Sequence, residues 1–250
     1  MEVDIYSLTI ALTYLGDAAL WILIAINMYW CGKGRKSLVL FFFIIMDIYL
    51  NDLLKELFKI PRPSTGPTGM GPYGFPSGHT ETVTLATVYL TLENPRLALL
   101  LALIPLVGYT RVALGVHTVL DVVGGAFVGL FIGMLAHYVQ ARLHGKRLLR
   151  WETGLAFSLL GVLTFMYYPH RTILLGGFLF GIAISMFIGA EEEVELYWAC
   201  IVVLNVIIAT LLFLYAYIEQ PIIKGLLSTL AGVAVFIGPK LLARIKDLLS

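Results

Sequence analysis

Two histidines and one aspartate have the residue types and the spacing that phosphoryl chemistry requires. Asp121 follows His117 by four residues, which is one helical turn if a helix has already started there. Its carboxylate can then accept a hydrogen bond from one imidazole nitrogen and leave the other nitrogen to attack phosphorus. His79 has no such partner nearby in the sequence and is suited to protonating a leaving oxygen. These residues predict a nucleophile, its orienting partner and a general acid.

Three basic side chains predict a binding site for the phosphoryl group itself. Lys55, Arg62 and Arg111 can neutralise non-bridging oxygens, and arginine can do so with two parallel hydrogen bonds. Ser77 and Gly78 are expected to begin a helix, whose backbone N–H groups and positive dipole end attract an anion. Phosphoryl transfer depends mainly on positioning and charge stabilisation of this kind.

The composition predicts that this chemistry takes place in a membrane. Of the 250 residues, 59% are hydrophobic and only 13% are charged, whereas about a quarter are charged in a typical soluble domain. These values exclude a disordered chain, a nucleic-acid binder and a soluble globular enzyme. The formal net charge of +1 indicates no polyanionic partner. The expected partners are the lipid bilayer and a membrane lipid substrate.

The elements that position these residues are expected to be transmembrane helices. A helix needs about 20 apolar residues to cross the hydrocarbon core. By this measure we expect an all-α polytopic bundle of about nine spans, with eight or ten as alternatives. The expected spans lie near residues 6–29, 37–58, 79–93, 97–115, 118–140, 151–168, 171–190, 196–217 and 222–243.

Two local patterns refine this arrangement. Gly125, Gly129 and Gly133 have the small-xxx-small spacing that lets membrane helices pack closely. The stretch 59–78 is rich in glycine and proline, and an irregular backbone of this kind must lie at the membrane surface or line a wet cavity.

The distribution of lysine and arginine predicts the orientation. Most of these residues fall on the side of the odd-numbered loops, which the positive-inside rule assigns to the cytoplasm. The N-terminus is therefore expected outside and the C-terminus inside. The chemistry-bearing residues lie at the outer helix ends, on the extracytoplasmic or lumenal face. The acidic start of the chain does not resemble a secretory signal peptide, so the first apolar run is expected to remain as a membrane helix.

Three short motifs resemble, in order, those of the type 2 phosphatidic acid phosphatase (PAP2) superfamily. They are Lys-x6-Arg-Pro at 55–63, Pro-Ser-Gly-His at 76–79 and Arg-x5-His-x3-Asp at 111–121. One departure is Thr110, where the family usually has serine. Because the hydroxyl group is kept, we expect activity to be retained. The three motifs together are highly specific, whereas any one of them alone would be weak.

The resemblance implies roles for the motif residues. His117 is expected to form a phosphohistidine, with Asp121 as its orienting partner and His79 as the general acid. The expected phosphate-binding residues are Lys55, Arg62, Ser77, Gly78 and Arg111. The family needs no metal, and no metal ligands or other cofactor are expected here. The two cysteines, Cys31 and Cys200, also lack a metal-ligand spacing.

The resemblance implies a domain organisation as well. Residues 1–141 are expected to form the PAP2-like catalytic core, with its first five helices. Residues 142–150 form a basic cytoplasmic linker, which is most simply a determinant of topology. Residues 151–250 supply additional transmembrane helices without an assigned role, and the two halves show no internal repeat.

The expected function is that of an integral-membrane phosphatase. The substrate would be a lipid phosphate or diphosphate, and polyprenyl diphosphate, phosphatidic acid, phosphatidylglycerophosphate and sphingoid phosphate all remain open. The alternatives are a phosphotransferase, or a catalytically silent lipid-binding or transport protein on the same scaffold. The complete set of acid, nucleophile and orienting residue argues against a silent protein. A vanadium-dependent oxidase is a more distant alternative, because the membrane setting suits a lipid substrate better.

Several polar residues within the spans have simpler interpretations. Asp47, Asn51 and Lys55 recur every four residues, and we favour a polar seam that positions Lys55 over a direct catalytic role for the other two. Glu81 fits a cavity wall and a supporting partner of the site equally well. Asp17 and Asn205 are expected to have structural roles, Asn205 through a hydrogen bond within the bundle.

Overall fold

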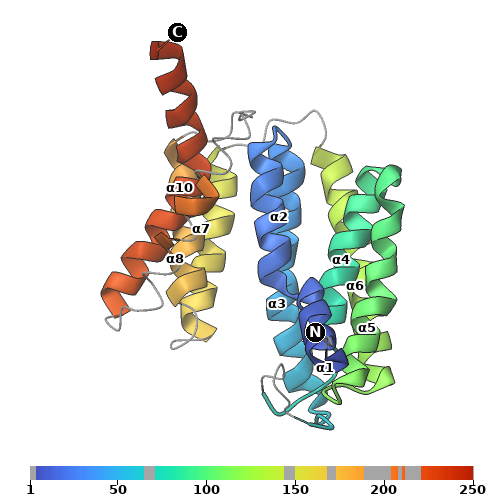
Figure 1. Ribbon diagram of the computed structural model, residues 1–250. Coiled ribbons are helices and arrows are strands. Elements are labelled where there is room, and N and C mark those ends of the chain that lie inside the picture. The colour runs from blue at the N-terminus through green and yellow to red at the C-terminus, as the bar shows by residue number, and fades with distance from the viewer. Residues whose placement is uncertain are drawn as a thin grey trace. The chain divides into compact units, whose positions relative to one another are not determined.

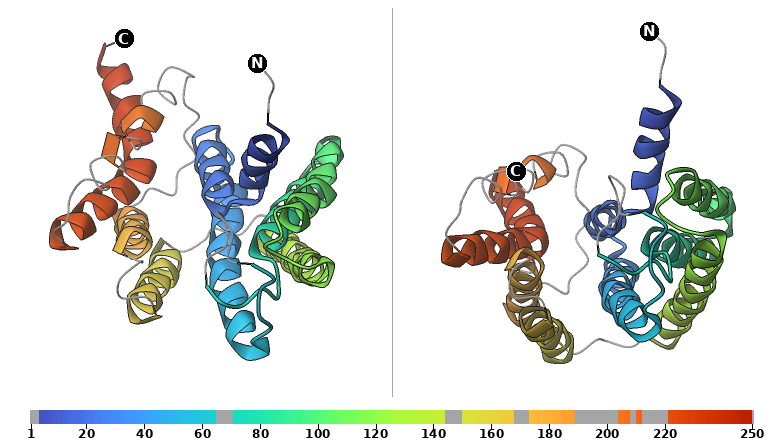
Figure 2. Two further views of the ribbon diagram at one scale, coloured as in Figure 1. Left: turned by 60° about the horizontal axis from the view of Figure 1, so that its bottom comes forward. Right: turned by 90° about the horizontal axis from the view of Figure 1, so that it is seen from below.

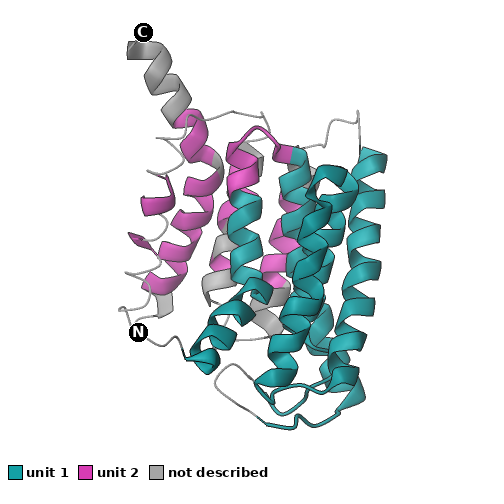
Figure 3. Cartoon of the chain, turned by 45° about the vertical axis from the view of Figure 1, so that its right-hand side comes forward, with its two compact units in different colours: residues 1–26, 35–144 teal, residues 27–34, 145–250 magenta. Residues whose placement is uncertain are grey.

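The computed structural model describes residues 4–64, 71–143, 150–167, 173–188, 204–207, 210–211 and 221–249. Helices dominate these segments (Figure 1). The chain forms two compact units, and Figure 3 shows the division. The first unit comprises residues 1–26 and 35–144, and the second comprises residues 27–34 and 145–250. Most of the predicted linker at 142–150 lies outside the described residues.

The N-terminal apolar segment is broken rather than continuous. It consists of α1 (Ile5–Thr13), the 3₁₀-helix η1 (Tyr14–Gly16) and α2 (Ala18–Trp30), and it bends by 50°. A Cβ atom at Gly16 would come within 2.8 Å of His79, so the chain approaches α4 closely at this point. The Asp17 side chain then accepts a hydrogen bond of 2.8 Å from the Ala19 N–H and starts a new helix. The expected span near 6–29 is therefore made of two helices joined by a bend rather than one straight helix.

Helix α3 (Gly34–Phe58) leads into the glycine- and proline-rich connection. The two described arms of this connection pair in antiparallel fashion, although no regular strand forms in the described residues. The Arg62 N–H donates to the Pro72 carbonyl at 3.0 Å, and the Gly74 N–H donates to the Ile60 carbonyl at 2.8 Å. This pairing fixes the backbone of Arg62 at the end of the unit where α3 stops.

Helix α4 (Gly78–Glu93) is the most enclosed helix of the first unit, and every residue from 80 to 90 is buried. It packs along α6 (Val119–Leu143) through glycines on α6. A Cβ atom at each glycine would collide with a backbone carbonyl of α4. The three pairs are Gly125 with Ser77, Gly129 with Glu81, and Gly133 with Leu85. The small-residue spacing therefore does bring two helices into backbone contact.

The expected span at 97–115 begins as a 3₁₀-helix. This segment, η2 (Pro95–Ala102), continues into α5 (Leu103–Ala113). Asn94 caps η2 by accepting a hydrogen bond of 3.3 Å from the Arg96 N–H. The two described arms of the α3–α4 connection and the turn between α5 and α6 lie at the same end of the unit (Figures 1 and 2).

Three described helical segments are long and apolar enough to cross a membrane: Gly34–Phe58, Pro95–Ala113 and Val119–Leu143. The bent pair at the N-terminus makes a fourth if it counts as one span. Phe127 and Phe131 of α6 are 69% and 68% exposed, as expected for side chains that face lipid rather than water. The expected total of nine spans stays a prediction.

The second unit contains α7 (Arg150–Tyr167), α8 (Ile173–Ile188) and α10 (Pro221–Leu249). Helices α8 and α10 pack closely, because a Cβ atom at Gly181 would collide with the Thr229 carbonyl. The side chain of Asn205 donates to that of Asn27 at 3.0 Å, in keeping with a structural hydrogen bond. Most of the expected span at 196–217 lies outside the described residues.

Candidate active site

The described part of the first unit holds a cavity of about 310 Å³ at the end where α3 stops and α4 begins. Six residues that sequence analysis assigned to the site line this cavity: Lys55, Arg62, Gly78, His79, Arg111 and His117. The other lining residues are Gly16, Asp17, Ala18, Asp47, Ile48, Asn51, Asp52 and Thr82. The fold thus brings residues from η1, α2, α3, α4 and α5, and from the connections that hold Asp17, Arg62 and His117, to one cavity.

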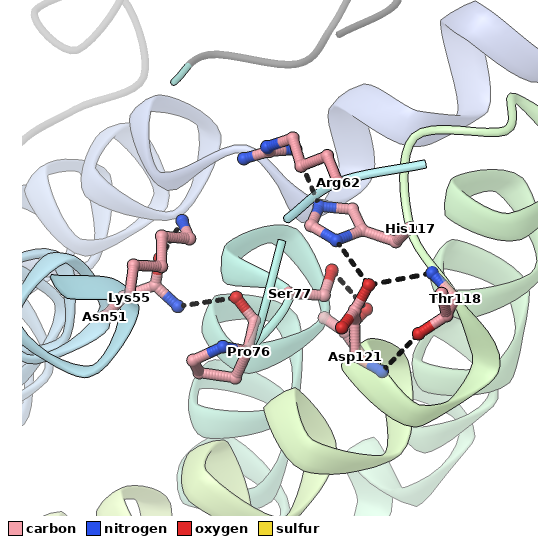
Figure 4. Close-up of polar contacts among 9 residues, drawn as sticks. Asn51, Lys55, Arg62, Pro76, Ser77, His117, Thr118 and Asp121 are labelled. Atoms are coloured by element: carbon pink, nitrogen blue, oxygen red, sulfur yellow. Dashed lines mark hydrogen bonds and ion pairs between the residues drawn. The ribbon is translucent and has the colours of Figure 1, made fainter. Parts of the chain in front are cut away.

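His117 lies in the turn between α5 and α6, just before the helix rather than within it. Its Nδ1 is nevertheless 3.5 Å from Asp121 Oδ2 (Figure 4). Two hydrogen bonds explain this geometry. The Thr118 N–H donates to Asp121 Oδ2 at 2.8 Å, and the Asp121 N–H donates to Thr118 Oγ1 at 3.1 Å. This reciprocal pair is a capping box, which holds the carboxylate beside the imidazole.

The other imidazole nitrogen faces a guanidinium group. Arg62 Nη1 is 3.1 Å from His117 Nε2 (Figure 4). Because a guanidinium can only donate, Nε2 is the acceptor in this contact, and Nδ1 carries the proton that faces Asp121. This contact favours the tautomer in which Nε2 holds a lone pair directed toward Arg62.

The surroundings of His117 favour its neutral form. Its side chain is almost fully buried, and this burial lowers its pKa. The positive charges of Arg62, Arg111 and Lys55 lower the pKa further. A neutral imidazole is the form that can act as a nucleophile.

Arg111 is held from two directions, although it is almost completely buried. Its Nη1 donates to Thr13 Oγ1 at the end of α1, at 3.0 Å. Its carbonyl oxygen accepts from the N–H groups of Val116 and His117, each at 3.3 Å. Gly115, with φ +68°, provides the left-handed conformation that this turn requires. The same residue thus places a cation in the cavity and fixes the backbone of His117.

The start of α4 is tied to the start of α6. The Ser77 N–H donates to the Asp121 carbonyl at 2.9 Å, and Ser77 Oγ accepts from Thr80 Oγ1 at 3.1 Å. Ser77 is fully buried. Neither Ser77 nor Asp121 is among the residues that line the cavity, whereas Gly78 and His79 are. Ser77 and Asp121 support the site from behind.

Lys55 enters the cavity from the last turn of α3. Its Nζ donates to Asn51 Oδ1, one turn earlier on the same helix (Figure 4). The Asn51 side chain also donates to the Pro76 carbonyl at 3.3 Å. Lys55 is thereby connected to the segment that precedes α4.

The described residues contain no group of three or more His, Cys, Asp or Glu side chains arranged to hold a metal ion. The cavity instead combines two histidines with three basic side chains. This arrangement suits the binding of a phosphoryl group and its transfer to an imidazole nitrogen.

Sequence reasoning missed two residues that support the site. They are Thr118 and Thr13. Thr118 precedes the predicted Asp121 with the Thr-x-x-Asp spacing of a capping box, and this pattern could have been recognised. Thr13 gives no local signal, because its partner Arg111 is 98 residues away.

Comparison with known proteins agrees with these features. The profile of the PAP2 superfamily matches residues 36–144. Phosphatidylglycerophosphatase B of Bacillus subtilis is 30% identical over 143 residues, covering 50% of this chain and 70% of that protein. Undecaprenyl-diphosphatase of Sulfolobus acidocaldarius is 29% identical over 144 residues, covering 54% of this chain and 70% of that protein.

A plant protein and a solved structure extend the comparison. Lipid phosphate phosphatase delta of Arabidopsis thaliana is 28% identical over 129 residues, but the match spans 42% of this chain and only 31% of that protein. The crystal structure of a transmembrane PAP2-type phosphatidylglycerolphosphate phosphatase from Bacillus subtilis superposes with a TM-score of 0.50 and 26% identity. It covers 59% of this chain and 82% of that one. With its membrane-spanning helices and these lipid phosphatase relatives, the chain is an integral membrane protein that belongs to the PAP2 superfamily.

Proposed function

We propose that this protein is a membrane-embedded phosphatase that hydrolyses a lipid phosphate or diphosphate through a phosphohistidine at His117. The observation that carries the proposal is the geometry of that imidazole. Nδ1 faces Asp121 at 3.5 Å, Nε2 contacts Arg62 at 3.1 Å, and His117 lines the same cavity as Lys55, Arg62 and Arg111. A nucleophile, its orienting carboxylate and three cations for one phosphoryl group are therefore assembled in one place.

In the first step the phosphoryl group binds to the three cations, and its oxygens replace His117 Nε2 as the acceptor for Arg62. Nε2 then attacks phosphorus while the bond to the leaving oxygen breaks. The leaving oxygen takes the electron pair of that bond and a proton from His79. Asp121 stabilises the positive charge that develops on the imidazole of His117.

In the second step water attacks the phosphohistidine and gives its proton to His79. The N–P bond breaks, its electron pair returns to Nε2, and inorganic phosphate leaves. The two steps regenerate both histidines. No step requires a metal, so we propose that the reaction is metal-independent.

A lipid substrate is supported by where the cavity lies. It opens among the ends of apolar helices, where the head group of an amphiphile reaches the site while its chains stay in the bilayer. The names of the relatives indicate polyprenyl diphosphates and phosphatidylglycerophosphate as the first candidates. The bias of lysine and arginine favours the extracytoplasmic face. We further propose that residues 1–141 are the catalytic core, because every lining residue belongs to them.

The test is release of inorganic phosphate by the purified full chain in detergent, with a chelator present. The substrates are a polyprenyl diphosphate, phosphatidic acid and phosphatidylglycerophosphate. We expect release from at least one of them and none above background from His117→Ala. His137→Ala is the matched control, because His137 pairs with Glu93 at 2.7 Å and does not line the cavity.

Three outcomes would contradict the proposal. The first is no phosphate release from any substrate, the second is equal release by His117→Ala, and the third is loss of activity with chelator that a divalent ion restores. Transfer of phosphate to an added alcohol in place of water would indicate the phosphotransferase instead.

A further inference from the structure

A chain of buried polar side chains adjoins Lys55, and three of its four members, Asp47, Asn51 and Thr82, line the cavity as well. Asp47, Asn51, Glu81 and Thr82 are each 5% exposed or less. Thr82 Oγ1 donates to Asp47 Oδ2 at 2.7 Å, and Asn51 Nδ2 donates to Glu81 Oε2 at 2.6 Å. Asn51 then accepts the hydrogen bond from Lys55. None of the three PAP2-like motifs includes these four residues.

Hydrogen bonds place the two carboxyl groups of this chain in one neighbourhood. Asp47 accepts from Thr82, the residue that follows Glu81, and Glu81 accepts from Asn51, which lies one helical turn after Asp47. Asp47 Oδ1 and Glu81 Oε1 are buried, and no N–H or O–H group among the described residues donates to either oxygen. Two ionised carboxylates side by side in a buried site repel each other strongly, whereas one shared proton turns the same contact into a hydrogen bond.

The Asn51 amide depends on this pair for its direction. Its NH₂ group donates to Glu81 and to the Pro76 carbonyl, which leaves its oxygen for the Lys55 ammonium. In the opposite orientation the NH₂ group would face the ammonium, and neither group can accept a hydrogen bond. The acceptors at Glu81 and Pro76, with the shorter hydrogen bond to Glu81, therefore orient Asn51 so that its oxygen faces Lys55.

We propose that Asp47 and Glu81 share one proton, and that this pair acts through Asn51 to hold Lys55 in place for the phosphoryl group. The proposal rests on the proposed function for its catalytic meaning. Asp47, Glu81 and Asn51 are positioning residues, because they act on the reaction through Lys55.

Gly78 fits the same arrangement. A Cβ atom at this position would lie 3.0 Å from Asn51 Oδ1, the atom that accepts from Lys55. The absence of a side chain at the start of α4 thus leaves room for the amide that orients the lysine. Gly78, the glycine of the second motif, therefore contributes to the positioning of Lys55 through its contact with Asn51.

A double-mutant cycle with Asn51→Leu and Lys55→Met tests the positioning role. The measurement is the Kd for orthovanadate by calorimetry in detergent, so the cycle does not depend on turnover. We expect Asn51→Leu alone to weaken binding by about tenfold, the scale of a lost hydrogen bond to a charged group. In the Lys55→Met background, Asn51→Leu should raise the Kd for orthovanadate by less than about twofold, because the lysine that Asn51 positions is already absent.

The matched control is Asn27→Leu, which removes a different side-chain amide pair, the one with Asn205 in the second unit. It should bind orthovanadate as the wild type does. Equal effects of Asn51→Leu in both backgrounds would overturn the proposal, since they would show that Asn51 does not act through Lys55. If the wild type binds orthovanadate with the expected coupling but hydrolyses no lipid, the proposed function fails and the positioning role stands.

The shared proton has its own test. At neutral pH the wild type should show an infrared carboxylic-acid C=O stretch that is absent from both Glu81→Gln and Asp47→Asn. In each variant the new amide donates to the remaining carboxylate, which no longer needs a proton. Survival of the band in both variants, or its absence from the wild type, would overturn the shared proton. Glu81→Gln should also weaken orthovanadate binding less than Glu81→Leu. Only the glutamine amide can both accept the hydrogen bond from Asn51 and donate one to Asp47.

Discussion

Arg62 Nη1 lies 3.1 Å from His117 Nε2, the nitrogen that the proposed mechanism assigns to attack on phosphorus. The guanidinium thus donates to the lone pair of the proposed nucleophile. A phosphoryl group offers Arg62 stronger, charged acceptors. In the proposed mechanism, binding of the substrate therefore releases Nε2 from Arg62 at the moment when the electrophile arrives.

Replacing Arg62 separates its two expected effects, which are binding of the phosphoryl group and coverage of His117 Nε2. Arg62→Ala should lower kcat/KM by about tenfold to a hundredfold, because charged hydrogen bonds to the phosphoryl group are lost. The same change should make His117 react faster with diethyl pyrocarbonate in the ligand-free protein, since Nε2 is no longer covered. Mass spectrometry of the modified peptide measures this rate. Arg96→Ala, which does not touch the cavity, is the control, and an unchanged rate in Arg62→Ala would show that the contact does not protect Nε2.

The buried His117 should make the stability of the protein depend on pH. Its pKa in the folded state is lowered, first by burial and then by Arg62 and the other cations. Between the ordinary histidine pKa near 6.5 and that lower value, the unfolded chain binds the proton and the folded chain does not. Stability therefore falls as the pH drops through this range, by up to about 1.4 kcal/mol per pH unit for one group.

This dependence can be measured from thermal melting in detergent between about pH 7.5 and pH 5.5. His117→Asn should show a smaller fall in Tm over this interval than the wild type, because asparagine does not titrate. The same fall in both proteins would mean that His117 is not held neutral by the fold.

The role of His79 should depend on the leaving group. A good leaving group such as p-nitrophenolate needs little protonation, so His79→Ala should keep part of its turnover on p-nitrophenyl phosphate. A lipid alkoxide leaves badly without a proton, and here the loss should approach the ~10²–10⁴-fold that general acids supply. Comparison of kcat on the two substrates is the measurement. Equal losses on both would assign His79 a structural or electrostatic role.

The capping box allows the catalytic and structural roles of Asp121 to be separated. Asp121→Asn keeps an acceptor for the Thr118 N–H, so it should change Tm little while it reduces turnover through weaker orientation of His117. Thr118→Ala removes the other half of the capping box and should destabilise the protein by about 1 kcal/mol. Unfolding of both variants in detergent, measured beside phosphate release, checks the contrast. A large stability loss in Asp121→Asn with normal specific activity would contradict it.

Much of the identity of this protein could be read from local sequence. The three motifs between residues 55 and 121 point to the PAP2 superfamily, and the comparisons confirm that membership. The composition indicated a membrane protein for the simple reason that charge is too scarce for a water-facing surface. The spacing of Gly125, Gly129 and Gly133 predicted close helix contact, because residues four apart share one face of a helix.

Tertiary structure alone decided which partners these residues meet. The chain at Gly16 packs against His79, and the Arg111 side chain donates to Thr13, 98 residues away. The contact between Arg62 and His117 crosses 55 residues and requires the pairing within the α3–α4 connection. Local periodicity carries information over one or two helical turns, whereas these contacts form only when separate helices pack together. The sequence by itself therefore indicated the candidate reacting groups, and the packing of the helices determined how each is oriented.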